Sequence, residues 1–241
     1  MSHIHLPDGV LPFWLWVSGL IVTFLVGMVL FRFTRKEELA QRLPLLGMMS
    51  AAMVLGASVE IVPIAYHVNL TVISGILLGP SLIFLATLVV NVILALFGHG
   101  GITVIGLNTL TLSIEGILGY LFFRLFWKLF KKLGVAIFGA TFLALFASTL
   151  SMIGVVALGA PHYEELIHSE GKGVFEFHLS KEKEDRDEEG AKGKVDLRKF
   201  IAIVLPLGFI GWVLEGVITA LIGRYIYRLR PDLLRLEGGS R

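Results

Sequence analysis

Three histidines and an α-amine lie at positions from which they could bind one metal ion. The first five residues carry two imidazoles close to the amine, and a third imidazole, His67, follows a long apolar stretch. An amine, the intervening amide nitrogen and an imidazole close fused small rings around one ion, and such nitrogen-rich sites suit Ni(II) or Cu(II). Because initiator methionine is commonly removed before a small residue, His3 would be second in a mature chain. We therefore predict a site made of the Ser2 (or Met1) amine, His3, His5 and His67; the alternative is a polar end that binds nothing.

The composition excludes several other kinds of chemistry. Of the 241 residues, 55% are hydrophobic and only 17% are charged, whereas a soluble domain carries about 25% charged residues. The sequence contains no cysteine, which excludes disulfides, thiolate metal sites and cysteine nucleophiles. A net charge of +2 gives no support to a nucleic-acid partner. No segment matches the G-x-x-x-x-G-K-[ST] pattern, so ATP is not hydrolysed by a P-loop in this chain.

Long stretches without charge predict an all-α integral membrane protein. A helix that crosses a bilayer needs about 20 mostly apolar residues, and residues 61–114 contain no Asp, Glu, Lys or Arg. Inside lipid the backbone must satisfy its own hydrogen bonds, which favours helices. We expect a bundle of about seven transmembrane helices, with spans near 11–31, 43–62, 68–79, 81–98, 103–123, 134–157 and 200–223.

Two of these helices, within residues 68–98, are expected to be short or bent. This region is too long for one straight span and too short for two, and its Leu78-Gly79-Pro80-Ser81 segment is typical of a turn. Basic clusters follow the first and the fifth spans, and both should face the cytoplasm. An even number of crossings must separate them, so the region should cross twice. The clusters comprise Arg32, Arg35, Lys36 and Arg42, then Arg124, Lys128, Lys131 and Lys132.

This topology places the N-terminus on the extracytoplasmic side of the cell membrane. Residues 1–10 lack the basic region and cleavage site of a signal peptide, so they are expected to remain as an extracytoplasmic metal-binding segment. The membrane bundle is expected over 11–158, a hydrophilic extracytoplasmic insert over 159–199, and the last span with a basic cytoplasmic tail over 200–241. The insert carries eight Lys and Arg residues, which runs against the positive-inside rule.

The same topology brings further candidate residues to the outer face. His67 follows the second crossing and His99 follows the fourth, so both should share that face with the N-terminus. Asp8, Glu60, His99 and Asn108 are candidates to orient a metal ligand by hydrogen bonding. The alternatives are structural: a tight turn at Asp8 and at His99, an interfacial position for Glu60, and a buried backbone partner for Asn108.

Five other ionisable residues have structural interpretations. Glu115 and Glu215 fall deep within predicted spans, where acidic side chains usually face the bundle interior and pair. No cationic partner for either is evident. His162, His168 and His178 lie in the charged insert, which is most simply a solvated segment.

Several motifs resemble those of the CbiM/NikM family, the substrate-capture subunits of energy-coupling-factor transporters for cobalt and nickel. The segment 5–12, HLPDGVLP, resembles the N-terminal signature of that family, and similar motifs occur at 74–80, 96–103, 215–220 and 230–231. The resemblance implies a metal held by the N-terminal amine, by the backbone nitrogen and imidazole of a histidine at position two, and by a histidine after the second span. His67 matches the last. His5 matches the first histidine by its place before Pro-Asp-Gly and His3 by its distance from a processed amine; we favour Ser2 and His3, with His5 close by.

The resemblance also implies a function and partners. The chain would bind Co(II) or Ni(II) outside and carry the ion across the bilayer, without a resident cofactor and without being an enzyme. Its partners would be a transmembrane coupling subunit, ATPase subunits and a small accessory membrane protein. The alternatives are a membrane metalloenzyme, although no H-E-x-x-H motif occurs, and a metal-sensing or structural membrane protein, which would show no metal flux. Nitrogen donors of this kind do not by themselves choose between cobalt and nickel.

Overall fold

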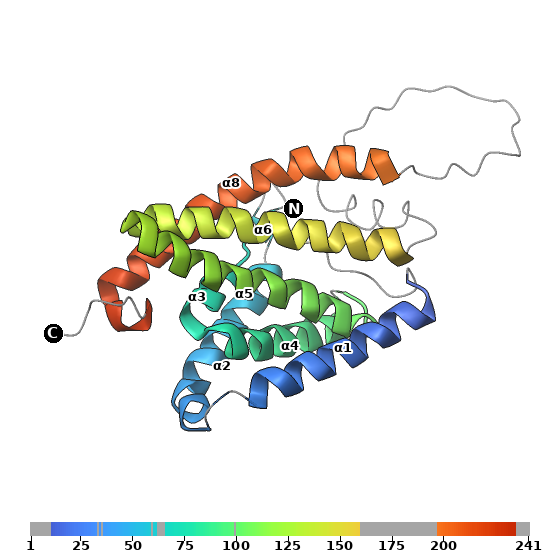
Figure 1. The fold of residues 1–241 in the computed structure, drawn as a ribbon, viewed down its shortest axis with the longest axis horizontal. Coiled ribbons are helices and arrows are strands. Elements are labelled where there is room, and N and C mark those ends of the chain that lie inside the picture. The colour runs from blue at the N-terminus through green and yellow to red at the C-terminus, as the bar shows by residue number, and fades with distance from the viewer. Residues whose placement is uncertain are drawn as a thin grey trace, which may run out of the picture.

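The protein is a bundle of α-helices, as a computed structural model shows (Figure 1). The structure describes residues 11–32, 34, 36–58, 60–61, 66–98, 100–159 and 197–234. Within these residues there are seven α-helices, a two-stranded hairpin and a 3₁₀ helix. The elements are α1 (Phe13–Arg32), α2 (Lys36–Ser58), β1 (Glu60–Ile61), β2 (Tyr66–His67), α3 (Thr71–Leu78), α4 (Pro80–Leu96), α5 (Ile105–Phe130), α6 (Leu133–Gly159), α8 (Leu197–Leu229) and η1 (Pro231–Leu234).

The expected fold class is confirmed. Five of the described helices, α1, α2, α5, α6 and α8, are long and apolar enough to cross a membrane. The two short helices fall where the sequence predicts them: α3 has 8 residues and α4 has 17. Helices α5 and α8 run on to Phe130 and Leu229, past the predicted span ends at 123 and 223, because a basic side chain near a helix end reaches water while its backbone stays helical.

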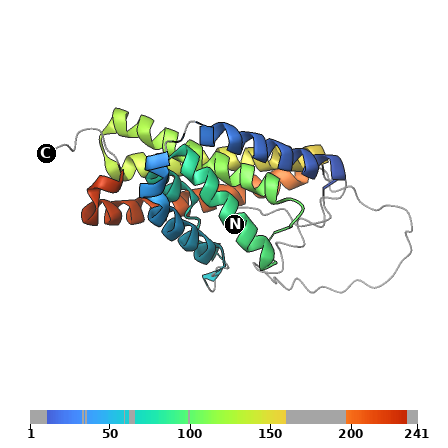
Figure 2. The same cartoon turned by 90° about the horizontal axis from the view of Figure 1, so that it is seen from below.

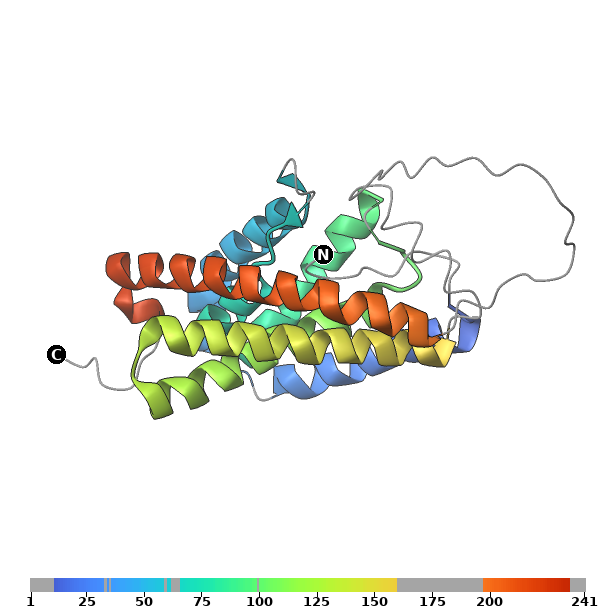
Figure 3. The ribbon, with the colours of Figure 1, turned by 90° about the horizontal axis from the view of Figure 1, so that it is seen from above.

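One predicted helix end is wrong. The second span was expected to reach residue 62, but α2 ends at Ser58, and Glu60 and Ile61 form the strand β1. This strand pairs antiparallel with β2, with Glu60 opposite His67 and Ile61 opposite Tyr66. The backbone of Glu60 and Ile61 is thus paired with a second strand rather than continued as another helical turn. The hairpin projects from the side of the bundle at the end of α2 (Figures 2 and 3).

Helix α1 packs against the bundle through small residues. Its only buried residues among those described are Leu15, Gly19, Thr23 and Gly27, which recur about every four positions and so form one face. A Cβ at Gly19 would overlap the Leu107 side chain of α5, and the Thr23 hydroxyl donates to Gly106 O at 2.8 Å. Small residues let two backbones approach closely in a membrane. The other faces of α1 expose large apolar side chains such as Phe13 and Phe24, as expected of a lipid-facing helix.

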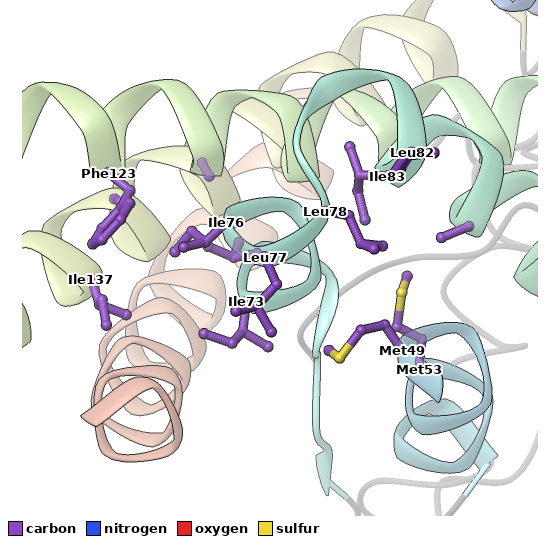
Figure 4. Close-up of a cluster of buried hydrophobic side chains, with 14 of the residues drawn as sticks. Met49, Met53, Ile73, Ile76, Leu77, Leu78, Leu82, Ile83, Phe123 and Ile137 are labelled. Atoms are coloured by element: carbon purple, nitrogen blue, oxygen red, sulfur yellow. The ribbon is translucent and has the colours of Figure 1, made fainter. Parts of the chain in front are cut away.

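The short helix α3 is the centre of the bundle. All eight of its residues are buried. Around it lie Met49 and Met53 of α2, Phe123 of α5 and Ile137 of α6 (Figure 4). Because neighbours cover α3 on every side, it is placed by packing and by the groups that bond its two ends.

The break between α3 and α4 depends on Gly79 and Pro80. Gly79 has φ +82°, a backbone region that glycine adopts without penalty. Pro80 is the first residue of α4, where its missing N–H leaves no helical hydrogen bond unmade. Arg42 of α2 donates to Leu77 O and Leu78 O at 3.3 and 3.4 Å. The last carbonyls of α3, which have no partner within the helix, are thus satisfied by a neighbouring helix.

Helices α6 and α8 lie side by side along the bundle, and α5 packs against α6 (Figures 1 and 3). Aromatic rings join α6 to α8, because Phe142 and Phe146 meet Trp212 edge-on at 5.9 and 5.3 Å between ring centroids. The C-terminal ends of α5 and α8 lie at the same end of the bundle (left in Figure 1). Lys128 and Arg228 lie in the last turns of these two helices, so the basic ends of both helices share one side.

The chain after α8 folds back onto α3. The Arg230 guanidinium donates to both carboxylate oxygens of Asp232, at 3.0 and 2.9 Å, and these bonds lower the pKa of the exposed Asp232 carboxyl. The bidentate pair lies at the start of η1, whose Leu234 is buried in the same core cluster as α3.

We predict that Gly75→Ala destabilises the protein. An added Cβ at Gly75 of α3 would overlap the backbone carbonyl of Gly116 in α5, and backbone cannot move aside as a flexible side chain can. Overpacking of this kind costs about 1–3 kcal/mol. Thermal unfolding in detergent measures the effect. The matched control is Gly154→Ala in α6, where an added Cβ meets nothing within 4 Å; equal stability of the two variants would contradict the prediction.

Candidate metal centre

His67, the predicted ligand in the described part of the chain, lies on the β1–β2 hairpin. It is the second residue of β2, and its cross-strand partner is Glu60. The side chain of His67 is partly exposed. Antiparallel pairing fixes the backbone on both sides of this residue, so the imidazole is carried by an ordered strand at the end of α2.

The residues that follow His67 press directly on α2. A Cβ at Gly56 would overlap the carbonyl oxygen of Val68. Only glycine leaves room for this approach of strand to helix. The hairpin is therefore held at its C-terminal side by a backbone contact one residue after His67.

Asn69, two residues after His67, is bonded through its backbone N–H and through both polar groups of its side chain. Its backbone N–H donates to Glu215 Oε2 at 3.3 Å, and its side-chain amide donates to Glu115 Oε1. Its carbonyl Oδ1 accepts from the N–H of Thr71 at 2.8 Å, which is the first residue of α3. Asn69 is only 2% exposed. One amide side chain therefore joins the loop that carries His67 to α3 and α5.

Both acidic residues face the interior of the bundle, as the sequence predicts. Glu115 of α5 and Glu215 of α8 are each 0% exposed. Thr219 donates to Glu215 Oε1 at 3.4 Å. Glu115 Oε2 lacks a partner with hydrogen-bond geometry among the described residues, although the Ser148 hydroxyl of α6 is close enough to act on this carboxylate.

Sequence reasoning missed Asn69. A search for cationic partners of Glu115 and Glu215 could not find it, because the donors are a neutral amide and a backbone N–H. A signal was present: Asn69 precedes Thr71 at the start of an apolar run, and Asn commonly caps the first N–H groups of a helix.

A small cavity lies beside Asn69. It measures about 10 Å³ and is lined mainly by apolar side chains, with Asn69 and Thr71 as the polar exceptions. A space of this size holds about one water molecule. This cavity is too small and too apolar to be the metal site.

The remaining predicted site residues are placed as follows. Asn108 is buried in α5, seven residues before Glu115 and so about 10 Å along the helix from it. Glu60 lies directly opposite His67 in the hairpin, so strand pairing brings these two residues close together although they are not adjacent in the sequence. The others, Met1, Ser2, His3, His5, Asp8 and His99, lie outside the described residues.

Among the described residues no three His, Asp or Glu side chains come together as a metal site. Of the predicted ligands, only His67 lies in the described part of the chain. The ligand set stays a prediction.

Comparison with known proteins identifies the family. The model of the CbiM family, described as the cobalt uptake substrate-specific transmembrane region, matches residues 5–233. A putative metal transport protein of Haloquadratum walsbyi is 30% identical over 243 residues, covering 96% of this chain and 93% of that protein. A putative fused cobalt transport protein, CbiMQ, of Methanocorpusculum labreanum is 28% identical over 95% of this chain, which spans 36% of that protein.

A solved structure has the same fold. The crystal structure of a transition metal transporter superposes with a TM-score of 0.68 and covers 95% of both chains at 20% identity. The helices described above thus form a known membrane transporter architecture. A match to a transport family over nearly the whole chain also sets aside the interpretation as a metalloenzyme. The chain belongs to the CbiM family and is the substrate-specific transmembrane component of a cobalt uptake transporter.

Proposed function

We propose that the protein captures Co(II) or Ni(II) at its extracytoplasmic face with His67 and the nitrogens of its N-terminus. The N-terminal donors are the amine of Ser2 (or Met1) and the backbone nitrogen and imidazole of His3, with His5 close by. The observation that carries this proposal is the position of His67 on a paired strand, in a chain whose family match begins at His5.

The hairpin suits a site of this kind because a nitrogen chelate is demanding in geometry. Square-planar coordination requires all the donors to lie in one plane. If a donor lay on a mobile loop, ordering of that loop would cost part of the binding free energy. The pairing of β1 with β2 and the contact of Val68 with Gly56 restrict His67 before the ion arrives.

Release of the ion needs a partner. A chelate that includes deprotonated amide nitrogens binds tightly, and those nitrogens must regain protons as the metal leaves. The chain has no P-loop motif, so the energy must come from another protein. We infer a transmembrane coupling subunit, ATPase subunits and a small accessory membrane protein. The name of the fused relative, CbiMQ, supports a neighbouring membrane partner.

The basic helix ends indicate which side faces the cytoplasm. Lys128 and Arg228 lie at one end of the bundle, and basic residues at span ends favour the cytoplasmic side. With that orientation the N-terminal segment 1–10 and the hydrophilic insert 159–199 are extracytoplasmic. The coupling subunit would then meet the basic end.

We expect His67→Ala to abolish tight binding of Co(II) and of Ni(II). Loss of a residue that only orients a ligand lowers metal affinity 10–100-fold in metalloproteins, so loss of a ligand should cost more than about 100-fold. Calorimetric titration of the detergent-solubilised protein with each metal salt measures the change. His168→Ala in the insert is the matched control and should bind normally. Native affinity in His67→Ala, with a loss in His168→Ala, would assign the metal to the insert.

Blocking the N-terminal amine should also prevent binding. Acetylation removes the amine as a donor. A tag fused before Met1 does the same, because it moves the amine farther along the chain from His3. Intact-mass analysis first establishes whether Met1 is present, and metal analysis of the desalted protein then gives the bound ion per chain. The same tag at the C-terminus serves as the control. Unchanged loading after the amine is blocked would refute the amine chelate, whereas His67 would remain under test by its own variant.

A further inference from the structure

Two fully buried carboxylates lie behind the loop that carries His67, and metal capture as proposed above gives them no role. Glu115 belongs to α5 and Glu215 to α8, and each is 0% exposed. Both are bonded to Asn69. Glu115 lies 46 residues from Asn69 in the sequence, and Glu215 lies 146 residues from it. Only folding of the bundle brings the three residues together.

Each carboxylate depends on Asn69 for a hydrogen bond. A carboxylate inside a membrane bundle is costly unless donors surround it. Glu115 Oε1 accepts from the Asn69 amide, and Glu215 Oε2 accepts from the Asn69 backbone N–H at 3.3 Å. The loop thus supplies donors that the interior acids need, and the acids in turn fix both the backbone and the side chain of Asn69.

The third bond of Asn69 sets the start of α3. Oδ1 accepts from the Thr71 N–H at 2.8 Å, one of the N–H groups that have no partner within the helix. Asn69 is therefore held by α5 and α8 and is bonded to the first residue of α3. Few other conformations of this residue would keep all three bonds.

The chain between Asn69 and His67 is too short to let one residue move independently of the other. Two residues of extended chain span about 7 Å, and the intervening Val68 carbonyl is pressed against Gly56 of α2. A shift of Asn69 consequently moves the strand β2 and the imidazole on it. Metal sites tolerate displacements of only about 0.5 Å before geometry is lost.

We propose that Asn69 is a positioning residue for metal capture, held by Glu115 and Glu215 so that His67 is presented to the ion in a single geometry. This inference rests on the proposed role of His67 as a ligand. It assigns the two interior acids a function in binding although neither touches the metal. It also makes the contact among α5, α8 and the loop a condition for capture.

The test separates positioning from general stability by comparing three variants. Glu115→Gln keeps an oxygen that can accept from Asn69, so binding of Ni(II) should stay within about threefold of the native protein. Glu115→Leu removes the acceptor at similar volume, and Asn69→Ala removes the donor. We expect both to lower Ni(II) affinity 10–100-fold, the range seen when a residue that orients a metal ligand is lost. The visible absorption of bound Ni(II), which reports coordination geometry, should also shift.

Ser113→Ala is the matched control. Ser113 lies in α5, is 2% exposed and bonds Thr87 of α4 at 2.7 Å, so its loss breaks a buried interhelical bond that does not involve the loop. Its unfolding temperature should fall while Ni(II) affinity and spectrum stay native. Should Glu115→Leu fail to fold, Asn69→Ala carries the test, because it removes the same bond and leaves the carboxylate in place.

The outcomes are distinguishable from those of the His67 test. If His67→Ala abolishes binding while Asn69→Ala and Glu115→Leu keep native affinity and spectrum, the positioning role is wrong and the ligand assignment stands. If Ser113→Ala lowers Ni(II) affinity as much as Asn69→Ala does, the positioning role is also wrong, because Ni(II) affinity would then simply follow the stability of the protein. If His67→Ala itself binds normally, the proposed function fails first.

Discussion

The structure depends on one constraint: polar groups inside the bilayer must find their partners within the protein. The short helix α3 shows how strict this is, because all eight of its residues are buried and its ends have no access to water. Its first N–H bonds Asn69 Oδ1, and its last carbonyls accept from Arg42. Thr23 meets the same requirement where α1 crosses α5, by donating to Gly106 O. The fold is therefore specified as much by a few polar pairs as by apolar packing.

Both ends of α3 are bonded to other elements, so this helix connects the loop of His67 to the break at Gly79. At its start α3 is bonded to the residue that contacts Glu115 and Glu215. At its end it meets Arg42 and the buried Leu234 of η1. A helix of eight residues is about 12 Å long and does not bend over such a length. The loop of His67 and the turn at Gly79 are therefore held about 12 Å apart by a single helix.

Much of this architecture follows from the sequence, for identifiable reasons. Lipid excludes charge so strongly that uncharged stretches mark the spans, and Gly79-Pro80 marks the break between α3 and α4 because both residues disfavour a continuing helix. The end of α2 was not predictable, since the hairpin needs the close approach of Gly56 to Val68. The role of Asn69 was equally hidden, because its partners lie 46 and 146 positions away. The N-terminal ligands lie outside the described residues and remain predictions.

The length of α3 also decides how deep His67 lies. A hydrocarbon core is about 30 Å thick, and α3 covers less than half of it. The chain enters α3 from the hairpin and α3 ends at Leu78, whose carbonyl accepts from Arg42 of α2, so the hairpin lies partway along the long helices. Figure 3 agrees, with the hairpin partway along α6 and α8. The imidazole of His67 is partly exposed there, so an ion can reach it, whereas Asn69 two residues later is only 2% exposed. The backbone of the loop is thus held from inside the bundle by Glu115 and Glu215, while the side chain that would bind the ion stays accessible to solvent.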